Sequence, residues 1–289
     1  MGLIDFILNL AGLLLWLNWR SLHLDPLARR TPATLVGTLR PAAPRRWRNW
    51  QLLAGLGLLL LLRSAFYWDI GSTVSWTPTL DLGVVALAFR SDSFPAGISL
   101  RATTLFSLLS FGHVLLVFYF WLLVLESLNR RNAEPDAVQK ILRLHLGRMA
   151  RWPWPVQLLL PLLLTAALWV AIHPLLVSIG VLNRAGSLAH LAEQGLLVGG
   201  GLVLTLKYLL PVILLLHLIV SYVYLGTSPL WDFISSTARN LLRPVQALRY
   251  GKLDLAPLAG ILLILLALHW LPNYVLRKLL EKNLTLWPQ

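Results

Sequence analysis

The sequence predicts an all-α, polytopic membrane protein, and its composition gives the first reasons. Of its 289 residues, 57% are hydrophobic and only 13% are charged, and the mean hydropathy is +0.69. Soluble domains carry about 25% charged residues, and a soluble fold of this size could not bury so much apolar surface. Long apolar runs, each of the length that crosses a bilayer, complete the prediction.

Six apolar runs predict six membrane-spanning helices, since about 20 apolar residues cross the hydrocarbon core. They lie at about residues 3–19, 51–68, 98–125, 156–182, 195–225 and 255–272. Trp16 and Trp19 are suited to anchor the end of the short first span at an interface. The run 195–225 is long enough to tilt or to extend beyond the membrane. Residues 74–90 are too short and too polar to span, so we expect an interfacial or partly buried segment there.

Basic residues predict the orientation. Three loops carry 17 of the 25 lysines and arginines: 20–50, 128–154 and 226–254. The intervening loops 69–97 and 183–194 hold only Arg90 and Arg184. Because basic loops stay in the cytoplasm, the three rich loops are predicted to be cytoplasmic and both termini to lie outside. The basic tail 273–289 then lies on the outer side, and we interpret it as a short amphipathic helix in the interface.

Several function classes find no support in the residues. The chain has no cysteine, so it has no disulfide, no thiolate metal site and no cysteine nucleophile. We find no nucleophile elbow, paired carboxylates, metal motif or nucleotide loop, and we predict no enzymatic activity. The N-terminal run lacks a basic start and a small-residue cleavage site and carries Asp5, so we interpret it as a retained helix.

Two loop-to-helix junctions repeat within the chain. LVGTLRPAAPRRWRNWQLLAG, from Leu35, and ARNLLRPVQALRYGKLDLAPLAG, from Ala238, share Leu-Arg-Pro and then an arginine beside an aromatic residue. We therefore expect a parallel internal repeat. The predicted organisation is repeat one at 1–73, a central segment with two spans at 74–194, repeat two at 195–272, and the tail at 273–289.

The second copy resembles the YggT family of small integral membrane proteins. The family repeat is a span, a loop with a Pro-x-x-x-Arg-like element, and Gly-x-Leu/Ile-Asp-Leu/Phe-Ser-Pro opening a second span. The matching residues are Pro244, Arg249, Gly251, Asp254, Ala256 and Pro257, with Ala256 in place of the serine. The first copy lacks the aspartate and the proline. The resemblance covers about half the chain and implies a bacterial inner-membrane protein without an established reaction, involved in assembling membrane complexes and, in plastids, in haem insertion.

Three functions from different classes follow. The first is a non-catalytic scaffold or assembly factor bound to other membrane protein subunits. The second is a channel or transporter for a small ion or solute, with Lys207, Asp254 and the span histidines along a polar path. The third is a haem-binding protein, since neutral imidazoles on facing helices ligate haem. Its candidate ligands are His113, His173, His217 and His269, which are otherwise expected to hydrogen-bond between helices or lie at an interface.

The basic loops are candidate contact sites for anionic lipid head groups or a protein partner, because each basic residue near a membrane surface attracts anionic lipid. The candidates are Arg40, Arg45, Arg46, Trp47, Arg243, Arg249, Lys252 and Asp254. Nucleic acid is the less favoured partner for arginine interleaved with tryptophan at a membrane. Asp254 and Pro257 are equally explained as a helix start, where aspartate accepts backbone amide hydrogens and proline fits the first turn.

Other polar residues in or near the spans have structural interpretations. We expect Arg63 and Arg101 to extend toward an interface. Lys207 is expected to satisfy the backbone carbonyl freed by Pro211. Glu126 is expected to be interfacial, and Gly199, Gly200 and Gly201 are expected to let helices pack closely.

Overall fold

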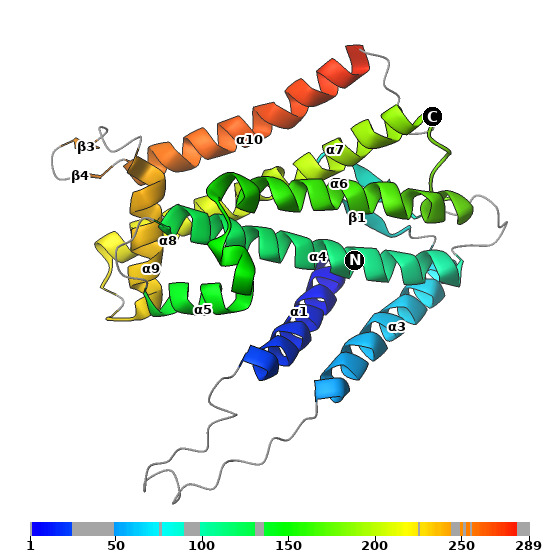
Figure 1. Ribbon diagram of the computed structural model, residues 1–289, viewed down its shortest axis with the longest axis horizontal. Helices are drawn as coiled ribbons and strands as arrows, with labels where there is room; N and C mark the ends of the chain where they lie inside the picture. Colours follow the sequence, from blue (N-terminus) through cyan, green and yellow to red (C-terminus); the bar gives the residue numbers. More distant parts are fainter. Residues whose placement is uncertain are drawn as a thin grey trace, which may run out of the picture. The chain divides into compact units, whose positions relative to one another are not determined.

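A computed structural model describes most of the chain. The described residues are 2–24, 49–74, 77–89, 99–130, 136–224, 226–243, 249–250, 253–254 and 256–281. They are mostly helical, which confirms the all-α prediction (Figure 1). The chain forms two compact units, one from Met1–Pro78 with Phe89–Leu115 and the other from Thr79–Ala88 with Leu116–Gln289.

The first unit consists of α1 (Gly2–Leu24), α3 (Asn49–Val74) and the first half of α4 (Leu100–Asn129). α1 packs against α3. Gly12 allows α4 to approach α1, because a Cβ atom at this position would lie only 2.9 Å from Cε2 of Phe111. Edge-to-face contacts join the ring of Phe106 to those of Tyr67 and Phe89, with centroids 5.7 and 5.3 Å apart.

The second unit contains the remaining helices. They are α5 (Ala137–Leu146), the 3₁₀ helix η2 (Gly147–Arg151), α6 (Trp154–Ser178), α7 (Leu188–Leu204), α8 (Leu206–Tyr222), α9 (Pro229–Leu242) and α10 (Ala256–Glu281). α8 packs against both α9 and α10, around the buried side chains of Leu214, Ala238 and Leu242. α7 and α8 are separated only by Thr205, so the long predicted fifth span is one helix interrupted at a single residue.

Glycines bring α6 and α7 together in antiparallel packing. A Cβ atom at Gly195 would lie 2.9 Å from the carbonyl oxygen of Ala166, and a methyl group at Gly199 would overlap the carbonyl oxygen of Leu162. The two glycines are four residues apart, the small-xxx-small spacing that lets membrane helices approach closely. Gly201 faces another neighbour, the carbonyl oxygen of Leu82, whereas a Cβ atom at Gly200 would have no neighbouring heavy atom within 4 Å.

Leu82 belongs to a short hairpin in the segment that was expected to be interfacial or partly buried. β1 (Thr79–Asp81) pairs antiparallel with β2 (Ala86–Ala88), with Thr79 opposite Ala88. The turn places Gly83 at φ +88°, a left-handed conformation that favours glycine, and the Asp81 side chain accepts a 2.8 Å hydrogen bond from the Gly83 amide. The side chains of Leu80, Leu82 and Leu87 are buried, as the sequence predicts for this segment.

Five stretches of helix have the length and composition to cross a membrane: Gly2–Ser21, Trp50–Ile70, Leu100–Asn129, Trp154–Ser178 and Leu188–Tyr222. They correspond to the first five predicted spans. The sixth predicted span lies in α10, whose apolar part, Ala256–Trp270, is shorter. α10 continues without interruption to Glu281, so the described part of the basic tail extends this helix.

Candidate functional site

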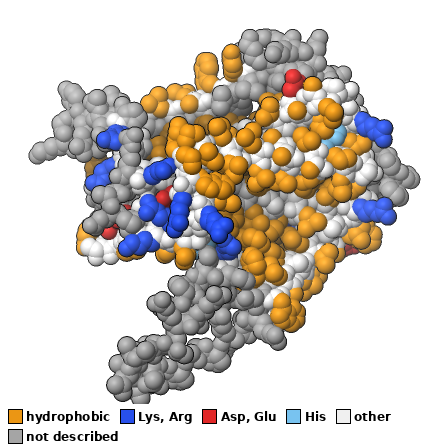
Figure 2. Space-filling view, viewed as in Figure 1, with side chains coloured by type: hydrophobic (Ala, Val, Ile, Leu, Met, Phe, Trp, Pro, Cys, Tyr) orange, Lys and Arg blue, Asp and Glu red, His pale blue; other side chains and the backbone are white. Residues whose placement is uncertain are grey.

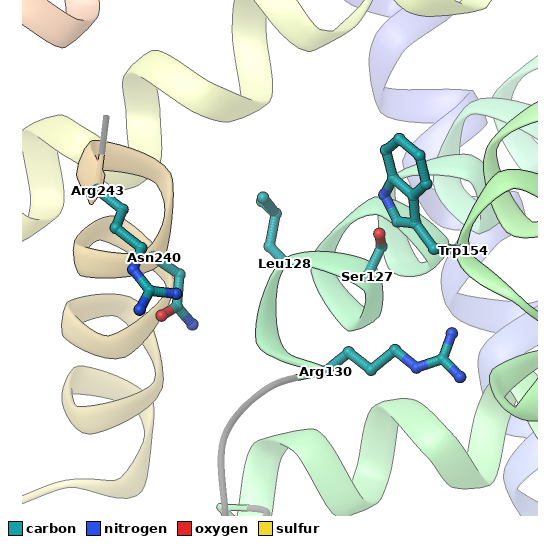
Figure 3. Close-up of a pocket in the computed structure, with 6 residues that line it drawn as sticks. All are labelled: Ser127, Leu128, Arg130, Trp154, Asn240 and Arg243. Carbon is teal, nitrogen blue, oxygen red and sulfur yellow. The ribbon is translucent and has the colours of Figure 1, made fainter. Parts of the chain in front are cut away.

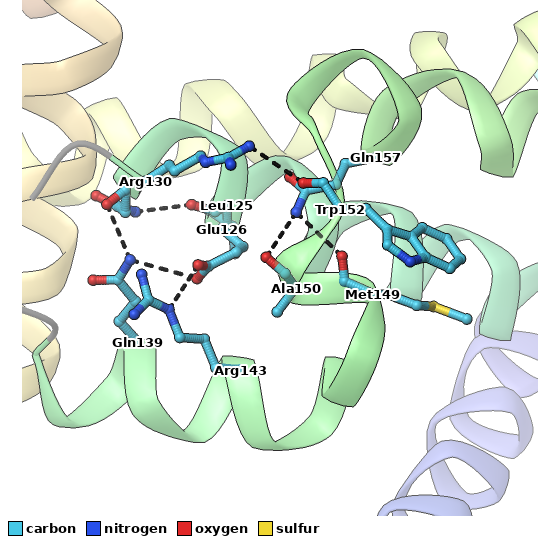
Figure 4. Close-up of polar contacts among 10 residues, drawn as sticks. Leu125, Glu126, Arg130, Gln139, Arg143, Met149, Ala150, Trp152 and Gln157 are labelled. Atoms are coloured by element: carbon cyan, nitrogen blue, oxygen red, sulfur yellow. Dashed lines mark hydrogen bonds and ion pairs between the residues drawn. The ribbon is translucent and has the colours of Figure 1, made fainter.

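A polar network surrounds Glu126 at the C-terminal end of α4. Only 3% of Glu126 is exposed, so its carboxylate is enclosed by protein at this end of α4. Nε of Arg143 donates a 2.7 Å hydrogen bond to Glu126 Oε1, and Nε2 of Gln139 lies 3.4 Å from Oε2 (Figure 4). Gln139 and Arg143 are four residues apart, so they share one face of α5. The buried carboxylate therefore receives its partners from a single amphipathic helix.

Asn129 extends this network from α4 to α9. Its amide nitrogen donates to the Leu125 carbonyl at 3.0 Å and to the Thr237 hydroxyl at 2.7 Å. Its side-chain oxygen accepts a 3.2 Å hydrogen bond from Asn240, and its backbone carbonyl accepts a 3.0 Å hydrogen bond from Gln139. The side chain of Asn129 thus bonds α9 and its backbone carbonyl bonds α5, so the end of α4 is held between these two helices.

The beginning of α6 is tied to the same end of α4. Nε2 of the buried Gln157 donates to the carbonyls of Met149 and Ala150 at 3.2 and 3.0 Å, which closes η2 onto α6. Arg130, immediately after α4, donates a 3.2 Å hydrogen bond to the Trp152 carbonyl (Figure 4). The ends of α4, α5, α6 and α9 thus form one hydrogen-bonded assembly.

A pocket of about 450 Å³ opens where α4, α6 and α9 meet. Its lining residues are Ser127, Leu128, Arg130, Trp154, Asn240 and Arg243. Figure 3 shows Arg243 and Asn240 at the end of α9 on one side, with Arg130 and Trp154 on the other. Both arginines are exposed, and within the described residues neither is ion-paired with a carboxylate. The pocket therefore carries two positive charges that the described acidic side chains leave uncompensated.

The predicted contact residues are only partly brought together. Arg243 lines the pocket. Five of the other candidates lie outside the described residues: Arg40, Arg45, Arg46, Trp47 and Lys252. Arg249 and Asp254 are opposite each other in the register of β3 (Arg249–Tyr250) and β4 (Leu253–Asp254), although their side chains lie outside the described set. Pro257 is the second residue of α10, in the first turn, as its helix-start interpretation requires.

The four span histidines belong to four helices: His113 to α4, His173 to α6, His217 to α8 and His269 to α10. His173 is buried, and its ring centroid lies 6.4 Å from that of Trp169. His269 is exposed. In the described portion of the chain, no group of three or more histidines, aspartates or glutamates is placed to hold a metal ion.

Arg63 belongs to a second polar cluster, within the first unit, that the sequence did not predict. Only 2% of Arg63 is exposed, so the expected extension toward an interface is wrong. It forms an ion pair with Asp5 and donates to Asn9 Oδ1 at 2.8 Å and to the Ser110 hydroxyl at 2.9 Å. The Tyr67 hydroxyl donates a 2.7 Å hydrogen bond to Asp5. Asp5 and Asn9 occupy positions i and i+4 of an otherwise apolar helix, and this spacing was the available signal.

Lys207 lies at the level of the beginning of α6. Gly199 meets Leu162 across the antiparallel α6 and α7, so Lys207, eight residues later, is about level with Trp154 in the first turn of α6. Its ammonium lies 5.0 Å from the centre of the Tyr208 ring, a cation–π distance. This contact takes the place of the expected hydrogen bond to the carbonyl freed by Pro211.

These features define an all-α protein of the polytopic membrane type, with closed polar clusters in its helices and a basic pocket at the ends of three of them. The chain matches no protein-family model, no curated protein sequence and no solved structure.

Proposed function

We propose that this protein is a non-catalytic integral membrane scaffold or assembly factor that associates with a larger membrane protein complex. The observation that carries the proposal is the closure of the polar cluster around Arg63. Its guanidinium bonds both the Asp5 carboxylate and the Asn9 amide oxygen, and the Asn9 amide nitrogen donates to the Ser110 hydroxyl. A conducting pathway needs polar groups that face a shared lumen, whereas these groups face each other between packed helices.

The end of the second unit fits a docking function. α5 and α9 are short amphipathic helices whose exposed side chains are both charged and apolar, and the Glu126 and Asn129 networks hold the two helices against α4. A rigid surface of this kind keeps a fixed shape for a partner, which lowers the entropy cost of association.

The YggT-like repeat remains part of the proposal, together with a bacterial inner-membrane location and cytoplasmic basic loops. Packing of α1 against α3 and of α8 against α10 supports it, because each predicted repeat then contains a contacting pair of helices. The family's association with membrane-complex assembly agrees with the scaffold function.

The channel and haem alternatives have weaker support. Among the described side chains, Lys207 contacts the ring of Tyr208, its neighbour on α8. The side chain of Asp254, the other acidic or basic member of the suggested path, lies outside the described residues. The haem alternative needs two of the four histidines to face each other, but the His269 side chain is exposed and the His173 ring contacts Trp169. A Soret band in the purified protein would establish the haem alternative.

The test is co-purification of the full chain from native membranes in a mild detergent, followed by mass spectrometry. A photo-crosslinking residue at Leu230 of α9 or Ile141 of α5, both exposed, should capture the same partner proteins. The matched control is a crosslinker at Leu163, which is exposed on the apolar face of α6 and should contact mainly lipid. A protein that purifies alone from every membrane preparation, without crosslinks at α5 or α9, would overturn the scaffold proposal.

A further inference from the structure

We infer that the pocket between α4, α6 and α9 binds the phosphate head group of an anionic phospholipid. The inference rests on the proposed function in one respect, that α4 and α6 span a membrane. It goes further by assigning a ligand class to the pocket and roles to its lining residues.

Charge is the first argument. Arg130, just after α4, and Arg243, at the end of α9, line the pocket from opposite sides, and both residues are exposed (Figure 3). The nearest acidic side chain of α4, Glu126, is already occupied by Arg143 and Gln139. Asp232 is in the first turn of α9, eleven residues before Arg243 and about 16 Å away along the helix. The pocket therefore favours an anion.

Hydrogen-bonding capacity is the second argument. Arg130 uses Nη1 to bond the Trp152 carbonyl, which orients the guanidinium and leaves its other N–H groups available. Arg243 adds a second planar fork of donors, the geometry that suits phosphate oxygens. The Ser127 hydroxyl also lines the pocket, and no described residue hydrogen-bonds it. The pocket therefore offers more hydrogen-bond donors than acceptors for them, and the oxygens of a phosphate group would accept these hydrogen bonds.

The apolar surroundings identify a lipid rather than a soluble phosphate. Trp154 lines the pocket with 56% of its surface exposed, and tryptophan is enriched at the level of lipid head groups. The exposed side chains of Leu164 and Leu168 lie farther along α6, within about 80° of Trp154 around the helix axis, and give the acyl chains an apolar surface. Figure 2 shows lysine and arginine side chains gathered over the α5 end of the second unit, beside a broad hydrophobic surface.

The experiment is a lipid titration of the delipidated full chain by native mass spectrometry. Phosphatidylglycerol and phosphatidylcholine with identical acyl chains are compared. We expect tighter binding of phosphatidylglycerol, weakened about five-fold by Arg243→Gln and about 25-fold by Arg130→Gln with Arg243→Gln. Arg239→Gln is the matched control, because it removes the same charge one turn earlier on α9 and lies outside the pocket lining.

Each result bears on the inference. Equal affinity for the two lipids, or equal weakening by Arg239→Gln and Arg243→Gln, would overturn it. Inorganic phosphate is the second probe: displacement of the lipid at comparable concentrations would show that the pocket takes a free anion instead. Arg243→Gln is the decisive variant, since Arg130 also bonds the Trp152 carbonyl and its loss disturbs the start of α6. Failure of co-purification would count against the scaffold proposal and would leave this lipid titration unaffected.

Discussion

At the scale of single residues, the burial of Arg63 carries a cost that its neighbours must offset. A charge in an apolar interior is tolerated only where opposite charge and hydrogen bonds compensate it. Here the compensation comes from two other helices, through Asp5 and Asn9 of α1 and Ser110 of α4. The guanidinium also lies 5.5 Å from the ring centres of Tyr67 and Phe106. Arg63 therefore links three helices by interactions that lipid cannot replace.

Replacing Arg63 with methionine should destabilise the first unit strongly. The substitution leaves Asp5 without its cation, and breaking a buried ion pair costs about 3–5 kcal/mol. The measurement is the free energy of unfolding in mixed detergent micelles titrated with sodium dodecyl sulfate. Arg101→Met, at an exposed position of α4 in the same unit, is the matched control and should have little effect.

A double variant separates the cost of an unpaired charge from the cost of lost packing. Combining Asp5→Leu with Arg63→Met removes both charges, and most of the lost stability should return because no uncompensated carboxylate remains. If Arg63→Met unfolds at the same point as Arg101→Met, the cluster does not stabilise the unit as we conclude.

At the scale of elements, three successive glycines of α7 have three different environments. Gly199 faces α6 and Gly201 faces the β1–β2 hairpin, whereas Gly200 faces open space. Successive residues of a helix point about 100° apart, so one short stretch serves two neighbours on different sides. The sequence predicts close packing at all three, but only two of them have a partner.

Alanine substitutions should distinguish these positions. Gly199→Ala and Gly201→Ala place a methyl group against a backbone carbonyl, and overpacking of this kind costs about 1–3 kcal/mol. Gly200→Ala meets no atom and should be neutral or stabilise the helix by up to about 1 kcal/mol. The thermal unfolding temperatures of the three variants in one detergent provide the measurement. Equal destabilisation by all three would contradict the packing of α7 described above.

α5 should depend on Glu126 for its attachment to α4. In Glu126→Ala, Gln139 and Arg143 lose their acceptor, and a lost buried hydrogen-bond partner costs about 1–3 kcal/mol. We expect amide hydrogen exchange in 137–146 to accelerate at least about five-fold, while exchange within α4 stays slow. Lys140→Ala, an exposed change on the same helix, is the control. Unchanged protection of α5 in Glu126→Ala would show that its apolar residues suffice to hold it.

At the scale of the whole molecule, the sequence predicts the spanning helices because their apolar composition determines them. Continuous apolar runs can only be helices in a membrane, because their backbone groups must bond within the segment, and the predicted spans accordingly fall within helices. The interruption at Thr205 was not predicted, since it depends on tertiary contacts. Trp121 donates a 3.0 Å hydrogen bond to the Thr205 hydroxyl, and that hydroxyl bonds the Leu202 carbonyl.

The sequence predicts only part of the candidate site, because tertiary contacts bring most of its residues together. The density of arginine marks the basic loops as contact regions, and Arg243 does line the pocket. Its other cation, Arg130, was counted in a loop, and Ser127, Trp154 and Asn240 had no distinguishing pattern. Hydrogen bonds of Asn129 and Gln157 help to bring the ends of α4, α9 and η2 together. Such side-chain bonds between distant residues leave no periodic signal in a sequence.

The predicted orientation has a direct test, because the chain contains no cysteine and each introduced thiol is the only one. Met149→Cys lies in the basic loop 128–154, Tyr224→Cys follows α8, and Leu188→Cys begins α7; all three positions are exposed. A membrane-impermeant maleimide should label Leu188→Cys in right-side-out vesicles and the other two in inside-out vesicles. Leu163→Cys, on the apolar face of α6, should react only after denaturation. Labelling of Leu188→Cys and Tyr224→Cys from the same side would mean that the chain turns back at Thr205 and that α7 and α8 do not form one span.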